Sequence, residues 1–197
     1  MDVLEKMAKR HSFYKLNNRV IQTKEEITNL IKTTLKLYPS SFNSQSARLL
    51  LLYEKEHNQF WQLVENVLLT TAPKEKHESI KQRISSFKKG FGTILYFEDR
   101  NITKDLEVRM PLYADNFKIW AQESNAMLQY MIWTILANNN IGASLQHYNP
   151  LINKNVAEIY KISSSWELVA QMPFGGIEEM PIAHPVKDID NKLLIRS

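Results

Sequence analysis

The stretch FKIWAQESNAMLQYMIWTILA, residues 117–137, is the longest helical pattern in the chain. Its apolar residues spread around most of the helix circumference instead of following one stripe: Ile119, Trp120, Met127, Leu128, Met131, Ile132 and Ile135. A helix that is apolar on most sides is expected to lie buried in the middle of a domain. We therefore predict a central helix on which the other elements pack.

Three apolar runs around this helix are typical of strands. They are RLLLLY at 48–53, TILYF at 93–97 and WELVAQM at 166–172. The first is continuously apolar, which predicts a strand buried on both faces. The third is expected to end at Pro173, Gly175 and Gly176, because these residues weaken or interrupt strands.

Shorter helices are expected elsewhere. One covers the first nine or so residues, and another follows the capping box of Thr23 and Glu26 and ends near Tyr38. Two more are expected around 60–68 and 80–87. Residues 98–116 show no clean period and are expected to form an excursion over a pocket, and the last twenty residues an extended tail. Strands that alternate with helices predict a layered mixed α/β or α+β structure.

The bulk composition indicates one folded domain, residues 1–197. A chain of 197 residues with 44% apolar residues can bury a sizeable core. The absence of cysteine excludes disulfides, thiolate metal sites and cysteine nucleophiles, and it fits a reducing, cytoplasmic location. The net charge of +4 comes without a basic stripe, so nucleic-acid binding is not expected.

Several other classes lack their motifs. The first residues, MDVLEKMAKRHS, show no signal peptide, and no apolar stretch approaches the roughly 20 residues of a membrane span. Walker, GxGxxG and HExxH motifs are missing. The histidines are scattered without ligand spacing, so no metal site is expected. A Ser-His-Asp triad stays open, although no GxSxG elbow is present.

Two polar segments offer ligand chemistry. In KRHS, residues 9–12, Arg10 and Ser12 can hold a phosphate, although the segment equally fits a solvated helix end. In PSSFNSQ, residues 39–45, hydroxyls and amides gather as if to bind a polar heterocycle, although serine and asparagine are also common in ordinary turns.

Together and in this order, these segments resemble the nitroreductase family of FMN enzymes. The resemblance continues through FKKGFGT at 87–93, PLYADNF at 111–117, GASLQHYNP at 142–150 and QMPFG at 171–175, so that it covers essentially the whole chain. The later motifs of the chain are similar to those of a short branch of the family found in bacteria and fungi. The family implies an α+β fold, a central antiparallel or mixed sheet surrounded by helices, and an intertwined homodimer.

The resemblance also implies site residues. Arg10, His11 and Ser12 would hold the FMN phosphate and ribityl chain, and Arg196 would close on the same phosphate. Ser40, Ser41 and Asn43 would reach the flavin from the partner subunit. Lys88, or its neighbour Lys89, would sit near the pyrimidine edge, with Gln146, His147 and Tyr148 on the opposite side of the ring. The family often has a basic residue where this chain has Tyr14, which puts that contact in doubt.

The implied activity is hydride transfer from NADH or NADPH through flavin N5 to a small acceptor, such as a nitroaromatic or a quinone, by a ping-pong mechanism. Lys88 would tune the flavin electrostatically. Trp120 would stack on substrates or serve as a core residue, and His147 would orient an acceptor or fill a polar rim. Two alternatives stay open: a flavin-binding regulatory or sequestering protein with little turnover, and a non-flavin interaction module.

Overall fold

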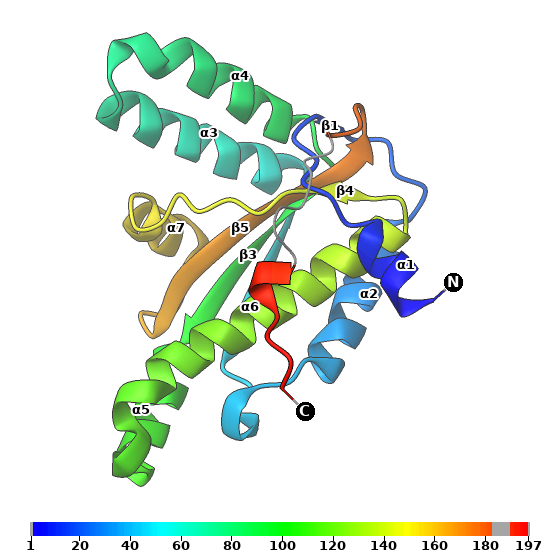
Figure 1. The fold of residues 1–197 in the computed structure, drawn as a ribbon. Helices are drawn as coiled ribbons and strands as arrows, with labels where there is room; N and C mark the ends of the chain where they lie inside the picture. Colours follow the sequence, from blue (N-terminus) through cyan, green and yellow to red (C-terminus); the bar gives the residue numbers. More distant parts are fainter. Residues whose placement is uncertain (1, 183–189, 197) are drawn as a thin grey trace.

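The computed structural model describes residues 2–182 and 190–196. Its centre is an antiparallel sheet in the order β1 (Leu16–Asn17), β5 (Trp166–Ile177), β3 (Gly92–Asp99) and β2 (Ala47–Tyr53). The short β4 (Gly142–Ala143) also pairs with β5, near its end. Figure 1 shows β5 as the long diagonal strand beside β3. The predicted α+β fold with a central sheet is confirmed.

Helix α6 (Ala114–Asn138) covers one face of the sheet together with α2 (Lys24–Leu37) (Figure 1). Ile94 and Tyr96 of β3 pack in the same buried cluster as Leu128 and Ile132 of α6. Since α6 has 25 residues and nine of them are buried, the prediction of a long central helix is confirmed. The capping box of Thr23 and Glu26 starts α2 as predicted.

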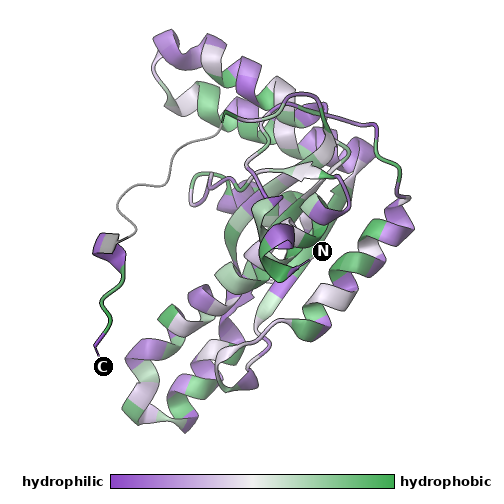
Figure 2. Cartoon of the chain, turned by 45° about the vertical axis from the view of Figure 1, so that its right-hand side comes forward, coloured by the Kyte–Doolittle hydropathy of each residue, from purple (hydrophilic) through white to green (hydrophobic). Residues whose placement is uncertain are grey.

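The other face of the sheet carries α3 (Glu54–Thr71), α4 (His77–Lys88) and α7 (Asn153–Tyr160). Leu95 and Phe97 of β3 point to this side, where they join Phe60, Trp61 and Phe87 in a second buried cluster. Successive residues of a strand face opposite sides, so β3 supplies both clusters. Figure 2 shows apolar residues concentrated on the strands and polar residues on the outer helix surfaces.

The run at 48–53 forms the edge strand β2, which packs on both faces: Leu49 and Leu51 meet the first buried cluster, and Leu50 and Leu52 the second. Most of its residues are only partly buried. Two predictions about the elements are wrong. Residues 98–116 are not an irregular excursion, because α5 (Arg100–Arg109) forms there, capped by Asp99. Its period was hard to see because only Thr103 and Leu106 are buried.

The second wrong prediction concerns the end of β5, which continues through Pro173 and the two glycines to Ile177. The glycines allow close packing there. A Cβ on Gly175 would lie 2.3 Å from the Asn17 carbonyl oxygen, and one on Gly176 would lie 2.2 Å from that of Arg19. Asn17, the last residue of β1, and Arg19, just beyond it, therefore approach the glycine backbones directly, and a side chain would push this segment away.

The N-terminal helix α1 (Val3–Ala8) buries none of its residues. Its apolar side chains Val3, Leu4 and Met7 are 66%, 71% and 40% exposed. At the other end, residues 190–196 stand apart from the body of the chain (Figure 2). Within the described residues, no helix is long and apolar enough to cross a membrane.

Candidate functional site

The first predicted segment is fixed onto the C-terminal half of α6. The Arg10 guanidinium lies over the Trp133 ring, with Cζ 4.5 Å from the ring centroid. The Trp133 indole N–H is within hydrogen-bond distance of the carbonyl oxygens of His11 (3.2 Å) and Ala143 (3.1 Å). Ser12 forms a bridge with Ala143, next to β5. Residues 10–12 are therefore held in place by a helix and a strand.

These residues line a cavity of about 710 Å³. Its walls come from the end of α1, the segment that follows, and the residues after β5: Met7, Ala8, Arg10, His11, Ser12, Tyr14, Lys15, Glu179, Met180, Pro181 and Ile182. Arg10, His11 and Ser12 all line it, and their guanidinium, imidazole and hydroxyl groups are donors that suit a phosphate. Tyr14 carries no charge, but its neighbour Lys15 does, and the Lys15 ammonium pairs with Glu179 at the cavity wall.

The second predicted segment forms a turn of unusual backbone geometry, which we call the flavin-loop turn, residues 40–45. Phe42, Asn43 and Gln45 have φ values of 54°, 51° and 48°. Left-handed backbone in residues other than glycine costs on the order of 1–3 kcal/mol each, and it clusters at functional sites. The Asn43 side chain is exposed, whereas the Ser40 hydroxyl accepts the Gln45 N–H at 3.0 Å.

This turn is fixed onto the N-terminal half of α6. The backbone N–H of Ser41 donates to the Ser124 hydroxyl at 3.2 Å. The Phe42 ring stacks on Trp120, with centroids 5.8 Å apart and planes 28° from parallel. Tyr113 and Phe117 complete an aromatic cluster that is partly open to solvent. Trp120 therefore belongs to this cluster at the edge of the turn, and is only partly buried.

One chain keeps the two segments apart. Arg10 is held at Trp133 and Phe42 at Trp120, thirteen positions earlier on the same helix. At 1.5 Å per residue, the two attachment points are roughly 20 Å apart along α6. The cavity at Arg10 contains no residue of the flavin-loop turn. The structure thus places both predicted segments on α6 but does not bring them together within one subunit.

Lys88 and Lys89 lie at the end of α4 and differ in their surroundings. The Lys88 ammonium is bound by Gln62 at 2.7 Å and by Glu65 at 3.1 Å, both on α3. The Lys89 side chain is exposed. Both residues line a cavity of about 590 Å³ together with Asn17, Asn18 and Phe91.

A buried hydrogen-bond chain holds the backbone next to these lysines. His57 Nε2 lies 3.2 Å from the Lys88 carbonyl oxygen, and its Nδ1 lies 2.8 Å from the Thr93 hydroxyl. Because a carbonyl only accepts, Nε2 carries the hydrogen and Nδ1 accepts from Thr93, which in turn accepts the Trp61 N–H at 2.8 Å. Burial lowers the pKa of His57 and keeps it neutral.

The segment Gln146, His147 and Tyr148 runs along β5, where Gln146 pairs with Gln171 through the backbone. The buried Gln146 amide donates to Ser144 at 3.1 Å. The Tyr148 ring meets Trp61 edge-on at 6.0 Å, and burial raises its pKa. His147 is the exposed member of the three. Arg196 is also exposed, in the segment that stands apart from the body (Figure 2).

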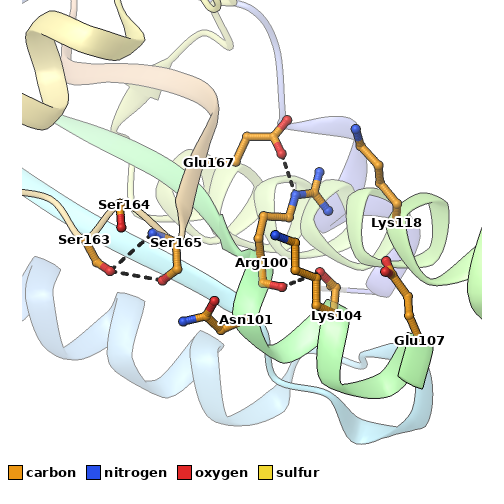
Figure 3. A pocket seen from close by; sticks show the side chains of 10 residues that line it. Arg100, Asn101, Lys104, Glu107, Lys118, Ser163, Ser164, Ser165 and Glu167 are labelled. Atoms are coloured by element: carbon orange, nitrogen blue, oxygen red, sulfur yellow. Dashed lines mark hydrogen bonds and ion pairs between the residues drawn. The ribbon is translucent and has the colours of Figure 1, made fainter. Parts of the chain in front are cut away.

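A further cavity, of about 660 Å³, contains none of the predicted site residues. Figure 3 shows its polar lining, in which Arg100 Nε pairs with Glu167 while Lys104 and Lys118 stand around them. This ion pair ties the start of α5 to the start of β5, and the hydrogen bond from Arg100 lowers the pKa of Glu167. In residues 2–182 and 190–196, no group of three or more acidic or histidine side chains is placed to hold a metal ion.

Sequence reasoning missed the residues that support the site. In the sequence, Trp133 is one residue of an apolar helix, Arg48 is the first residue of an apolar run, and His57 is one of five scattered histidines. Each acts through a partner that lies far along the chain, so no local pattern contained it. The two tryptophans of α6 are visible in the sequence, but the sequence does not show that the two polar segments pack on them.

Comparisons with known proteins agree with this architecture. A family model described as "Nitroreductase family" matches residues 7–176. Nitroreductase CinD from Lactococcus lactis, in complex with chloramphenicol, is 33% identical, covers 100% of both chains and superposes with a TM-score of 0.91. The same protein in complex with 4-nitrophenol is 32% identical, with the same coverage and TM-score.

Two other relatives are more distant. Nitroreductase FRM2 of Saccharomyces cerevisiae is 26% identical over 180 residues, which are 90% of this chain and 89% of that protein. A nitroreductase with bound FMN from Desulfitobacterium hafniense is 16% identical, with a TM-score of 0.74 over 100% of both chains. The last of these shows likeness of fold.

Proposed function

Since the chain belongs to the nitroreductase family of oxidoreductases, we propose that it is an FMN-dependent enzyme. It would pass hydride from NADH or NADPH to a nitroaromatic, a quinone or a similar small electron-poor acceptor in ping-pong fashion. The observation that carries the proposal is the cavity at residues 10–12, where the Arg10 guanidinium is fixed over Trp133 beside the Ser12 hydroxyl.

The donors of this cavity fit the phosphate of FMN. Arg10 offers a planar fork, and Ser12 and His11 add hydrogen bonds that a phosphate accepts well. Tyr14 carries no charge, and the ammonium of its neighbour Lys15 pairs with Glu179, so the phosphate would rely on Arg10 at this end of the site. Arg196 would join the phosphate from the C-terminal segment. When bound, FMN supplies the redox chemistry, and the protein supplies binding, orientation and electrostatics.

We propose a homodimer with two shared sites, as the separation of the two segments on α6 favours. Ser40, Ser41 and Asn43 of one subunit would meet Arg10 of the other. Apolar side chains that one chain leaves open support this: Val3 and Leu4 on α1, and Met127 and Tyr130 on α6, 42% and 38% exposed. Met127 and Tyr130 also line an apolar groove with Pro39 and Met131. Burial of such a surface drives association.

The surroundings of the two lysines favour Lys89 as the cation beside the flavin. The Lys88 ammonium is partly neutralised by Glu65, whereas the exposed Lys89 can turn toward a ligand in the cavity that both residues line. Gln146, His147 and Tyr148 would follow the other side of the ring, with His147 the side chain open to it. Lys89→Ala is expected to slow NAD(P)H oxidation more than Lys88→Ala, measured in parallel.

The aromatic cluster beside the flavin-loop turn supports a flat acceptor. Trp120, Phe42 and Tyr113 present partly open ring faces where an aromatic molecule can stack. CinD, which is similar over the whole chain, has been captured with 4-nitrophenol and with chloramphenicol. A cytoplasmic location stays a prediction from the sequence.

The test is direct. The purified protein is expected to be yellow, to release FMN on denaturation, and to oxidise NADH or NADPH when 4-nitrophenol or benzoquinone is added. A protein that stays colourless and shows no FMN affinity by titration contradicts the proposal. Tight FMN binding without turnover on any acceptor would instead support the sequestering alternative.

A further inference from the structure

The flavin-loop turn needs external support. Three of its residues, Phe42, Asn43 and Gln45, have left-handed backbone, a conformation that is unfavourable for residues other than glycine. Its internal hydrogen bonds, such as Asn43 N–H to the Ser40 carbonyl at 2.9 Å, shape the turn but do not fix its place in the protein. Such a conformation persists only where the surroundings determine it.

Arg48 provides support from β2, in addition to the contacts of Ser41 and Phe42 with α6. Its Nη1 donates to the carbonyl oxygens of Gln45, at 2.8 Å, and of Ala47, at 3.0 Å. Its Nη2 donates to Asp99 Oδ2 at 3.2 Å. One guanidinium therefore bridges the last residue of the turn and the end of the neighbouring strand β3.

The guanidinium is itself fixed. Its Cζ lies 5.8 Å from the centroid of the Trp166 ring, within the range of a cation–π contact. Its partner Asp99 is 13% exposed at the side chain and caps α5 by accepting the Asn101 N–H. Since Arg48 is held by a ring and a capping carboxylate, the Gln45 carbonyl that it binds is held too.

We propose that Arg48 is a positioning residue for the flavin: it holds the left-handed turn so that Ser41 and Asn43 face the flavin bound by Arg10 of the partner subunit. This role rests on the proposed function. Arg48 does not touch the flavin itself. A lysine cannot replace it fully, because one ammonium lacks the planar fork that reaches two carbonyls and a carboxylate together.

The role predicts which part of FMN is sensed. Arg48 acts on the turn, and the turn contacts the flavin ring, which FMN and riboflavin share. Loss of Arg48 should therefore weaken the affinity for FMN and for riboflavin by the same factor. Arg10 acts on the phosphate, so loss of Arg10 should weaken FMN selectively. A ratio of the two affinities therefore separates positioning at the ring from any contact with the phosphate.

The experiment uses Arg48→Met and Arg48→Lys, with Arg109→Met as the matched control, because Arg109 pairs only with Asp105 on an exposed helix surface among the described residues. FMN and riboflavin are titrated into each apo dimer. Arg48→Met is expected to lose on the order of tenfold affinity for both flavins, as removal of charge-assisted hydrogen bonds implies. Arg48→Lys should lose less, and Arg109→Met nothing.

A mixed dimer of Arg48→Met with Arg10→Ala should then recover about half of wild-type activity, because two-fold symmetry leaves one site intact. Wild-type affinity for both flavins in Arg48→Met, or a loss confined to FMN, would overturn the role of Arg48 while the proposed function stands. A wild-type protein that binds neither flavin would overturn both. If Arg48→Met fails to fold, Arg48→Lys in the same titration and mixed dimer decides the question.

Discussion

The two ends of α6 carry two half-sites that are built in opposite ways. At Trp133, residues 10–12 have no left-handed backbone, Ser12 bridges Ala143, and Arg10 stacks on the ring. At Trp120, the flavin-loop turn contains three left-handed residues and depends on Ser124 and Arg48. The first half-site presents charge and the second presents amides and hydroxyls. One chain therefore prepares both halves of a site but separates them by about half the length of α6.

The largest effect is expected when the halves are placed in different subunits. At an FMN concentration too low to load either variant, Arg10→Ala and Asn43→Ala homodimers should each be nearly inactive. Their mixed dimer, isolated with two affinity tags, should regain about half of wild-type activity, since one of its two sites carries neither lesion. A flavin-supplied mixed dimer with no recovery would show that both residues serve the same subunit's site.

A smaller effect distinguishes the chemistry of the two halves. Arg10→Ala should weaken FMN by about ten- to a hundredfold, the equivalent of roughly 1.5–3 kcal/mol for a charge-assisted bond, and riboflavin far less. Asn43→Ala should weaken both flavins alike, because Asn43 faces the ring in the proposed site. Fluorescence titration measures both. Equal loss of both flavins in Arg10→Ala would mean that Arg10 acts on folding.

The packing of β1 against β5, beside the first half-site, can be disturbed at Gly175. A Cβ on Gly175 would meet the Asn17 carbonyl oxygen at 2.3 Å and push β1 off the sheet. Gly175→Ala is expected to lower the free energy of unfolding by about 1–3 kcal/mol, the usual cost of overpacking. It should also complement Asn43→Ala but not Arg10→Ala in mixed dimers. Unchanged stability in chemical denaturation would contradict this account of the glycine.

The smallest effect is expected on stability, from a buried carboxyl near the second half-site. Glu98 is fully buried and accepts the Asn125 amide at 2.7 Å, and burial raises its pKa above 4.5. The folded state thus keeps a proton that the unfolded state releases, so this group lowers stability as pH rises above 4.5. Glu98→Gln should stabilise the protein at pH 7 by on the order of 1 kcal/mol.

The control for this prediction is acid pH. Near pH 3, well below the ordinary carboxyl pKa, both states hold the proton, and the difference between Glu98→Gln and wild type should be smallest. Urea unfolding at pH 3, 5.5 and 7 measures it. A difference that is constant over this range would mean that the carboxyl does not titrate between the folded and unfolded states.

Sequence patterns predicted the elements whose contacts are local or periodic. The apolar period of α6, the capping box of α2 and the apolar run of β3 were all visible, because each depends on residues within one or two turns or on strand alternation. The end of β5 was misjudged. Glycine commonly ends a strand, whereas here it admits the backbone of β1, a strand roughly 160 residues earlier in the chain.

The sequence by itself determined the chemical character of the two half-sites, since arginine, hydroxyl and amide side chains carry their chemistry wherever they lie. Only the tertiary structure decided that Arg10 stacks on Trp133, that Lys88 is bound by Glu65 while Lys89 is exposed, and that Arg48 holds Gln45. These outcomes depend on side chains that packing brings together from distant positions. The sequence of a short segment does not specify which distant side chain it will contact. The close packing of the core decides that.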